Sequence, residues 1–365
     1  IIMTVDFHKG GLMMGRLNVK LMSVIASVGI VLAGCVTDAT TKVEEKPEVK
    51  AAKQEQTLEK FYFTANEGGT ISKINVKDNK VTETIQADGV VHNIQLSPDG
   101  KVVAATLVPE SGHGHGSHGD EASGKVLFYD ANTNDLLKEV EVGNHPAHVV
   151  YTGDGKYVLV TNNEDDTVSI INARTYEVVK TIPTGKGPHG FRISADSKIA
   201  YIANMSEDTV SAINLETFAE ERIKTGNTPV TTGVTKDGKI LAVTLFSENS
   251  LAIVDLETKQ VVKVEVGVGP AQVYIGPDGK FAYVANQGTE ETPSNSMSIV
   301  NLETKTVVDE ILTGNGAHGV TVSGDGKFAY VTNMFDNTVS IIDLESKQVD
   351  TIDVGEIPNG ITVMD

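Results

Sequence analysis

The sequence predicts an all-β fold: a seven-bladed β-propeller with four-stranded antiparallel blades. Two observations lead to this prediction. A turn that reads Ser-Pro-Asp-Gly-Lys at residues 97–101 recurs along the chain, and three of its five intervals are 41 or 42 residues long. Each turn is followed by short runs rich in β-branched residues, without helical periodicity. Four short strands in about 41 residues are typical of one propeller blade.

The strands of one repeat can be placed in order from the innermost strand outward. After the turn at 152–156, a second strand is expected at Tyr157–Asn162, a third at Thr167–Asn172 and an outer strand at Val178–Ile182. The inner strand leads into the next turn, as at Gly319–Val322. The Asp-Gly pairs suit tight turns because glycine tolerates positive φ. We expect the asparagine that ends many second strands to satisfy backbone groups of the turn.

These motifs resemble those of the YVTN-repeat β-propeller family, from about residue 60 to the end of the chain. Tyr330-Val331-Thr332-Asn333 is nearly the literal motif, and Thr338–Glu345 and Ser97–Gly100 also match. Leu107 and Leu245 stand where the family has asparagine. We expect these two departures to weaken two turns without changing the fold.

The repeats also predict how the ring closes. Phe61–Lys80 supplies two strands and part of a third for the first blade, and six complete sets follow. Gly360–Met364 then remains as an unpaired inner strand. We expect it to pair with the first strand of the N-terminal blade, which would close seven blades without a free edge.

The N-terminal residues 1–34 are expected to be a signal peptide rather than part of the fold. Translation is expected to start at Met13 or Met14, which leaves residues 1–12 untranslated. Arg16 and Lys20 precede an apolar stretch, Leu21–Ala33, that is too short and too glycine-interrupted for a transmembrane span.

The sequence around the single cysteine resembles a bacterial lipobox. Leu32-Ala33-Gly34-Cys35 ends the apolar stretch, and the resemblance implies cleavage before Cys35 and lipidation of its thiol. The alternative is an ordinary signal peptide with an incidental cysteine. Residues 35–58 contain few apolar side chains and are expected to be a flexible tether, with the propeller at 59–365. We therefore predict a cell-envelope lipoprotein, periplasmic or on the cell surface, that contacts the membrane through its lipid anchor only.

Composition excludes several classes of protein. One cysteine in 365 residues permits no intrachain disulfide, no cysteine-rich zinc domain and no c-type cytochrome. Acidic residues outnumber basic ones 49 to 30, for a formal charge of −19. Nucleic acid is not an expected partner, because phosphate contacts need a basic footprint. An acidic protein instead favours cations as ligands.

A histidine-rich insertion is the first candidate metal site. The longest interval between turns inserts residues at Pro109–Ser123, a predicted loop between second and third strands, and the 47-residue interval inserts a similar loop at Gly288–Ser296. Imidazole and carboxylate groups in the first insertion could bind zinc, copper or nickel. The alternative is a disordered polar insertion that binds metal weakly. The candidate ligands are His113, His115, His118, Asp120 and Glu121.

A second group of histidines lies at the junctions between outer and inner strands. Antiparallel order places these junctions and the histidine-rich insertion on the same face of the propeller. The group could surround the mouth of the central channel and bind a metal there. The alternative is that Pro-His-Gly is the family consensus, with each imidazole packed on a channel water. The members are His92, His145, His148, His189 and His318.

These features predict a non-catalytic envelope scaffold that binds a transition metal, zinc or copper above all, or an envelope protein partner. In a metal-delivery version, the insertion would capture the ion and the channel histidines would receive it. Binding would weaken below about pH 6, because the ligand is neutral imidazole. Two alternatives remain: an interaction scaffold without metal, or an enzyme or haem-d1 protein, which the resemblance to related propellers implies. No Ser-His-Asp constellation is recognisable by spacing.

Overall fold

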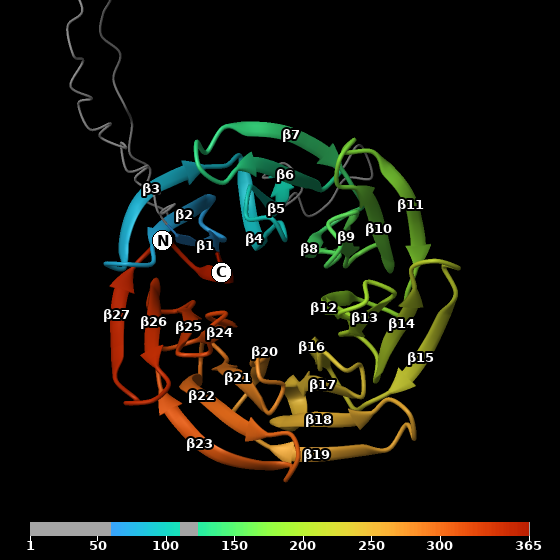
Figure 1. The fold of residues 1–365 in the computed structure, drawn as a ribbon, viewed down its shortest axis with the longest axis vertical. Helices are drawn as coiled ribbons and strands as arrows, with labels where there is room; N and C mark the ends of the chain where they lie inside the picture. The colour runs from blue at the N-terminus through green and yellow to red at the C-terminus, as the bar shows by residue number, and fades with distance from the viewer. Residues whose placement is uncertain (1–59, 110–122, 365) are drawn as a thin grey trace, which may run out of the picture. The chain divides into compact units, whose positions relative to one another are not determined.

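The computed structural model describes residues 60–109 and 123–364. Seven antiparallel sheets of four strands surround a central axis (Figure 1), which confirms the predicted all-β seven-bladed propeller. No helix in these two ranges is long and apolar enough to cross a membrane. The predicted signal peptide, Cys35 and the tether lie outside the described residues, and so do all five candidate ligands of the histidine-rich insertion.

The strands fall into four concentric sets. The inner strands are β4 (Gly89–Leu96), β8 (Pro146–Tyr151), β12 (Pro188–Ile193), β16 (Pro229–Val234), β20 (Pro270–Ile275), β24 (Ala317–Val322) and β28 (Pro358–Val363). The second strands are β1 (Phe61–Asn66), β5 (Val102–Pro109), β9 (Tyr157–Asn162), β13 (Ile199–Asn204), β17 (Ile240–Leu245), β21 (Phe281–Gly288) and β25 (Phe328–Asn333).

The two outer sets complete each blade. The third strands are β2 (Thr70–Asn75), β6 (Lys125–Asp130), β10 (Thr167–Asn172), β14 (Thr209–Asn214), β18 (Ser250–Asp255), β22 (Pro293–Asn301) and β26 (Thr338–Asp343). The outermost are β3 (Lys80–Gln86), β7 (Leu136–Glu141), β11 (Val178–Pro183), β15 (Glu220–Lys224), β19 (Val261–Glu265), β23 (Thr306–Leu312) and β27 (Val349–Asp353).

The core lies between the blades rather than at one centre. Strands two and three of each blade are buried on both faces, because each blade packs on its neighbours, whereas the outermost strands are largely exposed. Phe191 of β12, for example, is fully buried in a cluster with Leu159 of β9 and Ile202 of β13. Across the junction of the first and last blades, the rings of Tyr62 and Tyr330 lie 4.8 Å apart.

The first and last parts of the described chain share one sheet. The inner strand β28 is hydrogen-bonded antiparallel to β1, with Tyr62 opposite Val363. The register shifts between Thr64 and Asn66. The pairing gives the N-terminal blade its inner strand.

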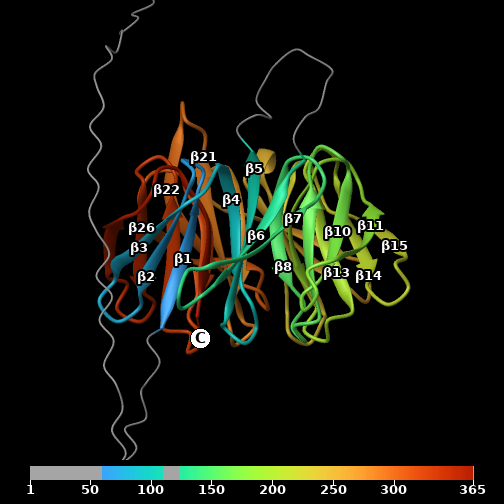
Figure 2. The same ribbon diagram turned by 90° about the horizontal axis from the view of Figure 1, so that it is seen from above.

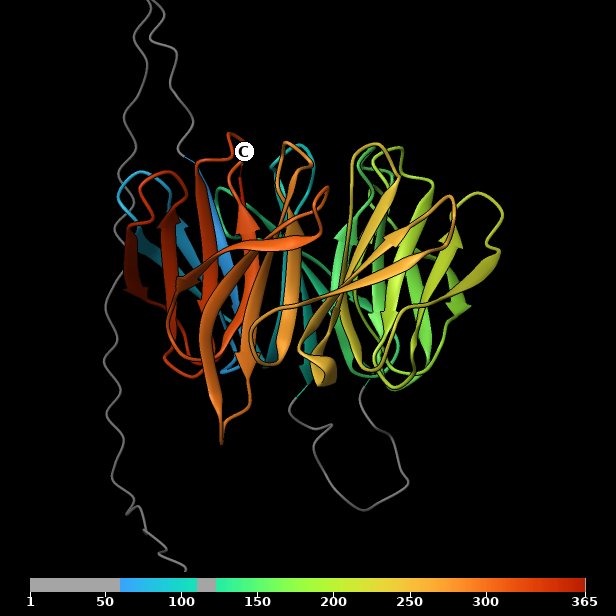
Figure 3. The same cartoon turned by 90° about the horizontal axis from the view of Figure 1, so that it is seen from below.

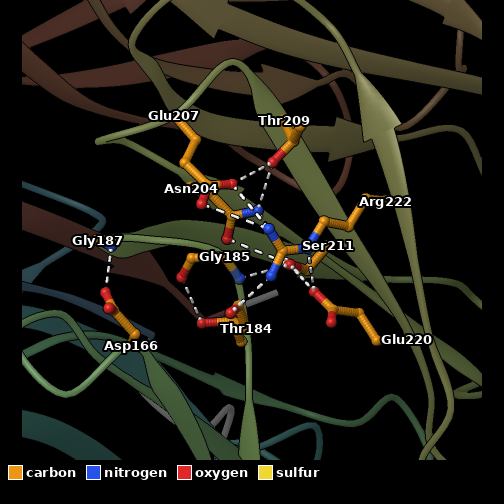
Figure 4. A network of polar contacts seen from close by, with 10 residues as sticks. All are labelled: Asp166, Thr184, Gly185, Gly187, Asn204, Glu207, Thr209, Ser211, Glu220 and Arg222. Atoms are coloured by element: carbon orange, nitrogen blue, oxygen red, sulfur yellow. Dashed lines mark hydrogen bonds and ion pairs between the residues drawn. The ribbon is translucent and has the colours of Figure 1, made fainter.

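The asparagine at the end of the second strand binds side chains more than backbone. Asn204 donates hydrogen bonds from Nδ2 to the hydroxyl groups of Thr209 and Ser211, each at 3.0 Å (Figure 4). The same side-chain bonds recur at Asn162 and Asn333, whose Oδ1 atoms also accept a backbone N–H from the preceding junction. The expectation of backbone capping was therefore incomplete, since the main partners are hydroxyl groups of the third strand.

Two local expectations need correction or refinement. Residues 288–296 do not form a loop, because β21 and β22 extend as a hairpin and leave only a four-residue turn between Gly288 and Pro293. After Leu245, which replaces the asparagine, the chain forms a short 3₁₀ helix, η2 (Phe246–Glu248). Leu107 and Leu245 are both buried, so each replaces polar bonds with apolar packing.

One face of the propeller carries the starts of all inner strands, and we call it the histidine face. The hairpin of β21 and β22 projects from this face, whereas β28 ends at the opposite face (Figures 2 and 3). Pro109, the last described residue before the histidine-rich insertion, pairs with Gly89 at the start of β4. Pro109 therefore lies at the histidine face.

Candidate metal centre

Four of the predicted junction histidines lie inside the inner strands rather than before them. His92, His189 and His318 share one register, each directly after the residue that pairs with the position of the recurring asparagine, which is Leu107 in β5. His148 lies one residue further along β8. The inner strands begin earlier than the sequence indicated, because the residue before each register shift already pairs with the second strand, as Pro188 does with Asn204.

Three of these histidines meet at the axis. The Nε2 atoms of His92 and His189 are 3.3 Å apart, and the ring centroids of His148 and His189 are 4.9 Å apart. Among the described residues, His92, His148 and His189 are the only set of three metal-ligating side chains whose ligand atoms all lie within 4.8 Å of one another. They come from three consecutive blades, through β4, β8 and β12.

A carboxylate determines which nitrogen of His92 carries the proton. Glu67, in the turn after β1, lies 2.8 Å from His92 Nδ1 and also accepts a hydrogen bond from Asn359 Nδ2 at 2.7 Å. Burial alone would raise the pKa of Glu67, but the hydrogen bonds from His92 and Asn359 and the charge of His92 lower it to about 2. An ionised carboxylate only accepts, so His92 Nδ1 must donate a proton to it.

The backbone determines the tautomer of His189 in the same way. His189 Nδ1 lies 3.2 Å from the carbonyl oxygen of Val230, which can only accept a hydrogen bond. When both imidazoles are neutral, the two Nε2 lone pairs therefore face each other across 3.3 Å. Such a pair is stable only with a cation between the nitrogens: a proton, which would make His92 an imidazolium, or a metal ion.

The third imidazole distinguishes these two cases. His148 is fully buried, and neither of its ring nitrogens has a hydrogen-bond partner. A proton shared by His92 and His189 would leave His148 unsatisfied, although buried polar atoms are rarely left so. A metal ion would bind a nitrogen of all three rings. Two ligand nitrogens about 2.0–2.1 Å from a tetrahedral zinc lie roughly 3.3 Å apart, close to the separation of His92 and His189.

Burial keeps these ligands in the form that a metal requires. It lowers the pKa of His189 to about 3, with a further contribution from the charges of His92 and His318. Burial also holds the pKa of His148 well below its usual value, and the charge of His189 adds to that effect. Both imidazoles are therefore neutral at physiological pH, with a lone pair available to a metal.

The other two junction histidines stay outside this triad. His318 Nδ1 lies 3.4 Å from Gln272 Nε2, and burial lowers the pKa of His318 to about 4. His145 precedes β8, is 41% exposed and lies 3.6 Å from Glu164 Oε1. Its ring centroid is 6.4 Å from that of His92.

Sequence reasoning missed the residues that orient the imidazoles. Glu67 was not recognised because one acidic residue after a strand looks like any polar turn residue. A signal was available: Glu67 directly follows a second strand, and the topology places such turns on the histidine face. The carbonyl of Val230 leaves no sequence signal, because any residue would supply it.

The comparisons with known proteins agree on the architecture. A family model described as YNCE-like beta-propeller matches residues 124–292 and 219–365. No curated protein matches the chain by sequence.

Solved structures match the fold at low sequence identity. Hydrazine synthase of Kuenenia stuttgartiensis has a TM-score of 0.65 and 22% identity, over 74% of this chain and 89% of that chain. A candidate 6-phosphogluconolactonase of Bacteroides fragilis has a TM-score of 0.64 and 14% identity, over 85% and 99% of the two chains. Its counterpart from Bacteroides uniformis has a TM-score of 0.64 and 16% identity, over 84% and 99%. At these identities the likeness concerns the fold.

Proposed function

The chain belongs to the YNCE-like β-propeller family, and from this premise we propose that it is a non-catalytic propeller that binds a transition metal, zinc or copper, on its axis. His92, His148 and His189 are the proposed ligands. The observation that carries the proposal is the pair of Nε2 atoms 3.3 Å apart, each left as a lone pair by the acceptor on its Nδ1. The described residues contain no cysteine, and imidazole suits both metals.

Each residue of the site has a defined task. The three imidazoles offer nitrogen ligands, and Glu67 and the carbonyl of Val230 hold two of the rings in the required tautomer. Asn359 holds the Glu67 carboxylate in turn. Three protein ligands leave a fourth position for water or for a ligand atom from a partner. A bound ion supplies Lewis acidity and a link to such a partner.

Delivery of the metal is part of the proposal. The histidine-rich insertion follows Pro109, which pairs with Gly89 on the strand that carries His92. Its proposed ligands, His113, His115, His118, Asp120 and Glu121, would capture the ion and transfer it to the axis. The proposed location is the cell envelope, with Cys35 as the lipid anchor. Mass spectrometry of the mature N-terminus would detect a lipidated Cys35, and an unmodified Cys35 would contradict the anchor.

Metal analysis of protein purified without a histidine tag or a nickel column tests the axial site. We expect about one zinc or copper per chain in the wild type and in the control variant His145→Asn. The double variant His92→Asn/His189→Asn should lose the ion, because it lacks two of the three imidazole ligands. Asparagine should fit at both positions, since Asn359 occupies the same register in β28. A triple variant His113→Ala/His115→Ala/His118→Ala should keep the axial ion and lose only weak additional binding.

Calorimetric titration of the metal-free protein with Zn²⁺ then separates the two sites. Equal affinity and stoichiometry in the wild type and in the His92→Asn/His189→Asn variant would refute the axial site. Equal titrations of the wild type and the triple insertion variant would refute a role of the insertion.

A further inference from the structure

The half of the axis away from the histidines contains a cavity of about 740 Å³. Asn93 and Gln272 line its inner end, next to the histidine layer, and the turn at 97–101 lines its outer end. This volume lies in the range of small-molecule sites. None of the three proposed metal ligands lines the cavity, so it needs its own explanation.

One layer of equivalent positions on the inner strands gives the cavity its chemistry. The layer lies three residues after the register that His92, His189 and His318 share. Of its seven residues, one on each inner strand, Val150 and Gly233 have no polar side chain and the other five do. The layer contains no carboxylate, although the chain as a whole carries a formal charge of −19. Its polar members are Gln95, Arg192, Tyr274, Thr321 and Thr362.

The arginine of this layer has no acidic partner. Arg192 Nη1 donates to the carbonyl of Phe191 at 2.9 Å, and within 60–109 and 123–364 no carboxylate lies within ion-pair distance of its guanidinium. Arg222, near the outer edge of the fourth blade, differs, because Glu207 and Glu220 flank it (Figure 4). Burial lowers the pKa of Arg192, whose half-buried side chain lines the cavity.

A charge in this position is costly unless something balances it. We propose that the cavity binds a small organic molecule whose carboxylate pairs with Arg192 and whose apolar part lies against Ile94, Leu96 and Ile361. One guanidinium matches one negative charge, and a guanidinium fork fits the two oxygens of a carboxylate. This site is independent of the metal centre, on the other half of the axis.

The surroundings of the cavity fit an anion with an apolar body. Tyr274 and Thr321 supply hydroxyl groups near Arg192, and Lys60 and Lys101 lie at the open end. Asp99 also lines that end, but its Oδ2 lies 3.3 Å from Lys101 Nζ and its Oδ1 accepts a hydrogen bond from the Ser97 hydroxyl group. A smaller cavity of about 310 Å³ shares Arg192 and Tyr274 and adds Lys236. The cationic groups would attract an anion into an otherwise acidic protein.

Calorimetry with octanoate as the probe tests the proposal. We expect one octanoate per chain, with affinity about tenfold to a hundredfold lower in Arg192→Gln, because a hydrogen-bonded charge pair is lost. Arg192→Lys should lie between them, and Arg174→Gln, on the exposed turn after β10, should bind as the wild type does. Tyr274→Phe should weaken binding a few-fold if its phenol contacts the carboxylate.

Two further probes identify the head group. Octanol should bind equally to the wild type and to Arg192→Gln, since it carries no charge. Equal octanoate affinity in these two proteins, or no octanoate binding at all, would overturn the proposal. Tighter binding of octyl phosphate than of octanoate would overturn the assignment to a carboxylate. Unchanged thermal unfolding of Arg192→Gln would show that any lost binding does not come from misfolding.

Discussion

Acid should destabilise this propeller through its buried histidines. His189 and His318 have pKa values of about 3 and about 4 in the fold, against about 6.5 in an unfolded chain. Between pH 6.5 and these values the unfolded chain binds protons that the folded chain does not, so stability falls as the pH falls. From pH 7 to pH 5 the loss is about 2 kcal/mol for each histidine, or about 4 kcal/mol for the pair.

Substitution of both histidines should remove this acid-induced loss of stability. The double variant His189→Asn/His318→Asn has no titrating group at these positions, and Asn359 shows that asparagine fits the register. We expect its free energy of unfolding to fall about 4 kcal/mol less than that of the wild type between pH 7 and pH 5. His148 and His92 stay in both proteins, and Glu67, with a pKa of about 2, stays ionised throughout.

Denaturant unfolding in chelator-containing buffer at the two pH values measures the difference. The chelator is needed because a bound metal stabilises the neutral imidazoles by mass action. His145→Asn is the control, since that side chain is 41% exposed and should change the pH dependence little. If the double variant lost as much stability as the wild type, burial would not hold these two imidazoles neutral, and they would not be in the form that binds a metal.

Three further predictions concern other parts of the molecule. Glu67→Gln should lower zinc affinity about tenfold to a hundredfold in calorimetry, because His92 loses the carboxylate that orients it; unchanged affinity would exclude that role. Asn204→Ala should lower the free energy of unfolding by about 1–3 kcal/mol, since it removes the hydrogen bonds to Thr209 and Ser211, whereas the exposed Asn227→Ala should not. Phe191→Ala should cost about 3–5 kcal/mol in the same assay because the fully buried ring leaves a cavity, and a loss under 1 kcal/mol would contradict its packing.

Local sequence patterns were sufficient to predict the strands. Runs such as Tyr157–Asn162 and Thr167–Asn172 are strands with the predicted bounds, because alternation and turn residues act over a few positions. Residues 288–296, expected as a loop, are instead the end of the hairpin of β21 and β22. The alternating Ser-Asn-Ser-Met of β22 was compatible with a strand, but only pairing with β21 made it one.

The polar network of the blades was only partly predictable. The recurring asparagine was noticed, but its partners depend on the register between the second and third strands. In that register Asn204 lies opposite Thr209, and its Nδ2 reaches both Thr209 and Ser211. A sequence reveals that the residue recurs, whereas the pairing reveals which groups it binds.

The sequence by itself determined the repeat, the strands and the face of the propeller that carries the junction histidines, because these follow from short-range periodicity and antiparallel order. Only the tertiary structure decided which histidines meet. His92 and His189 are separated by 97 residues, and the curvature of the ring brings their Nε2 atoms to 3.3 Å while it leaves His145 at the rim. The same packing set Glu67 against His92 and left Arg192 without an acidic partner among the residues that the structure describes, since neighbours across the axis belong to different blades.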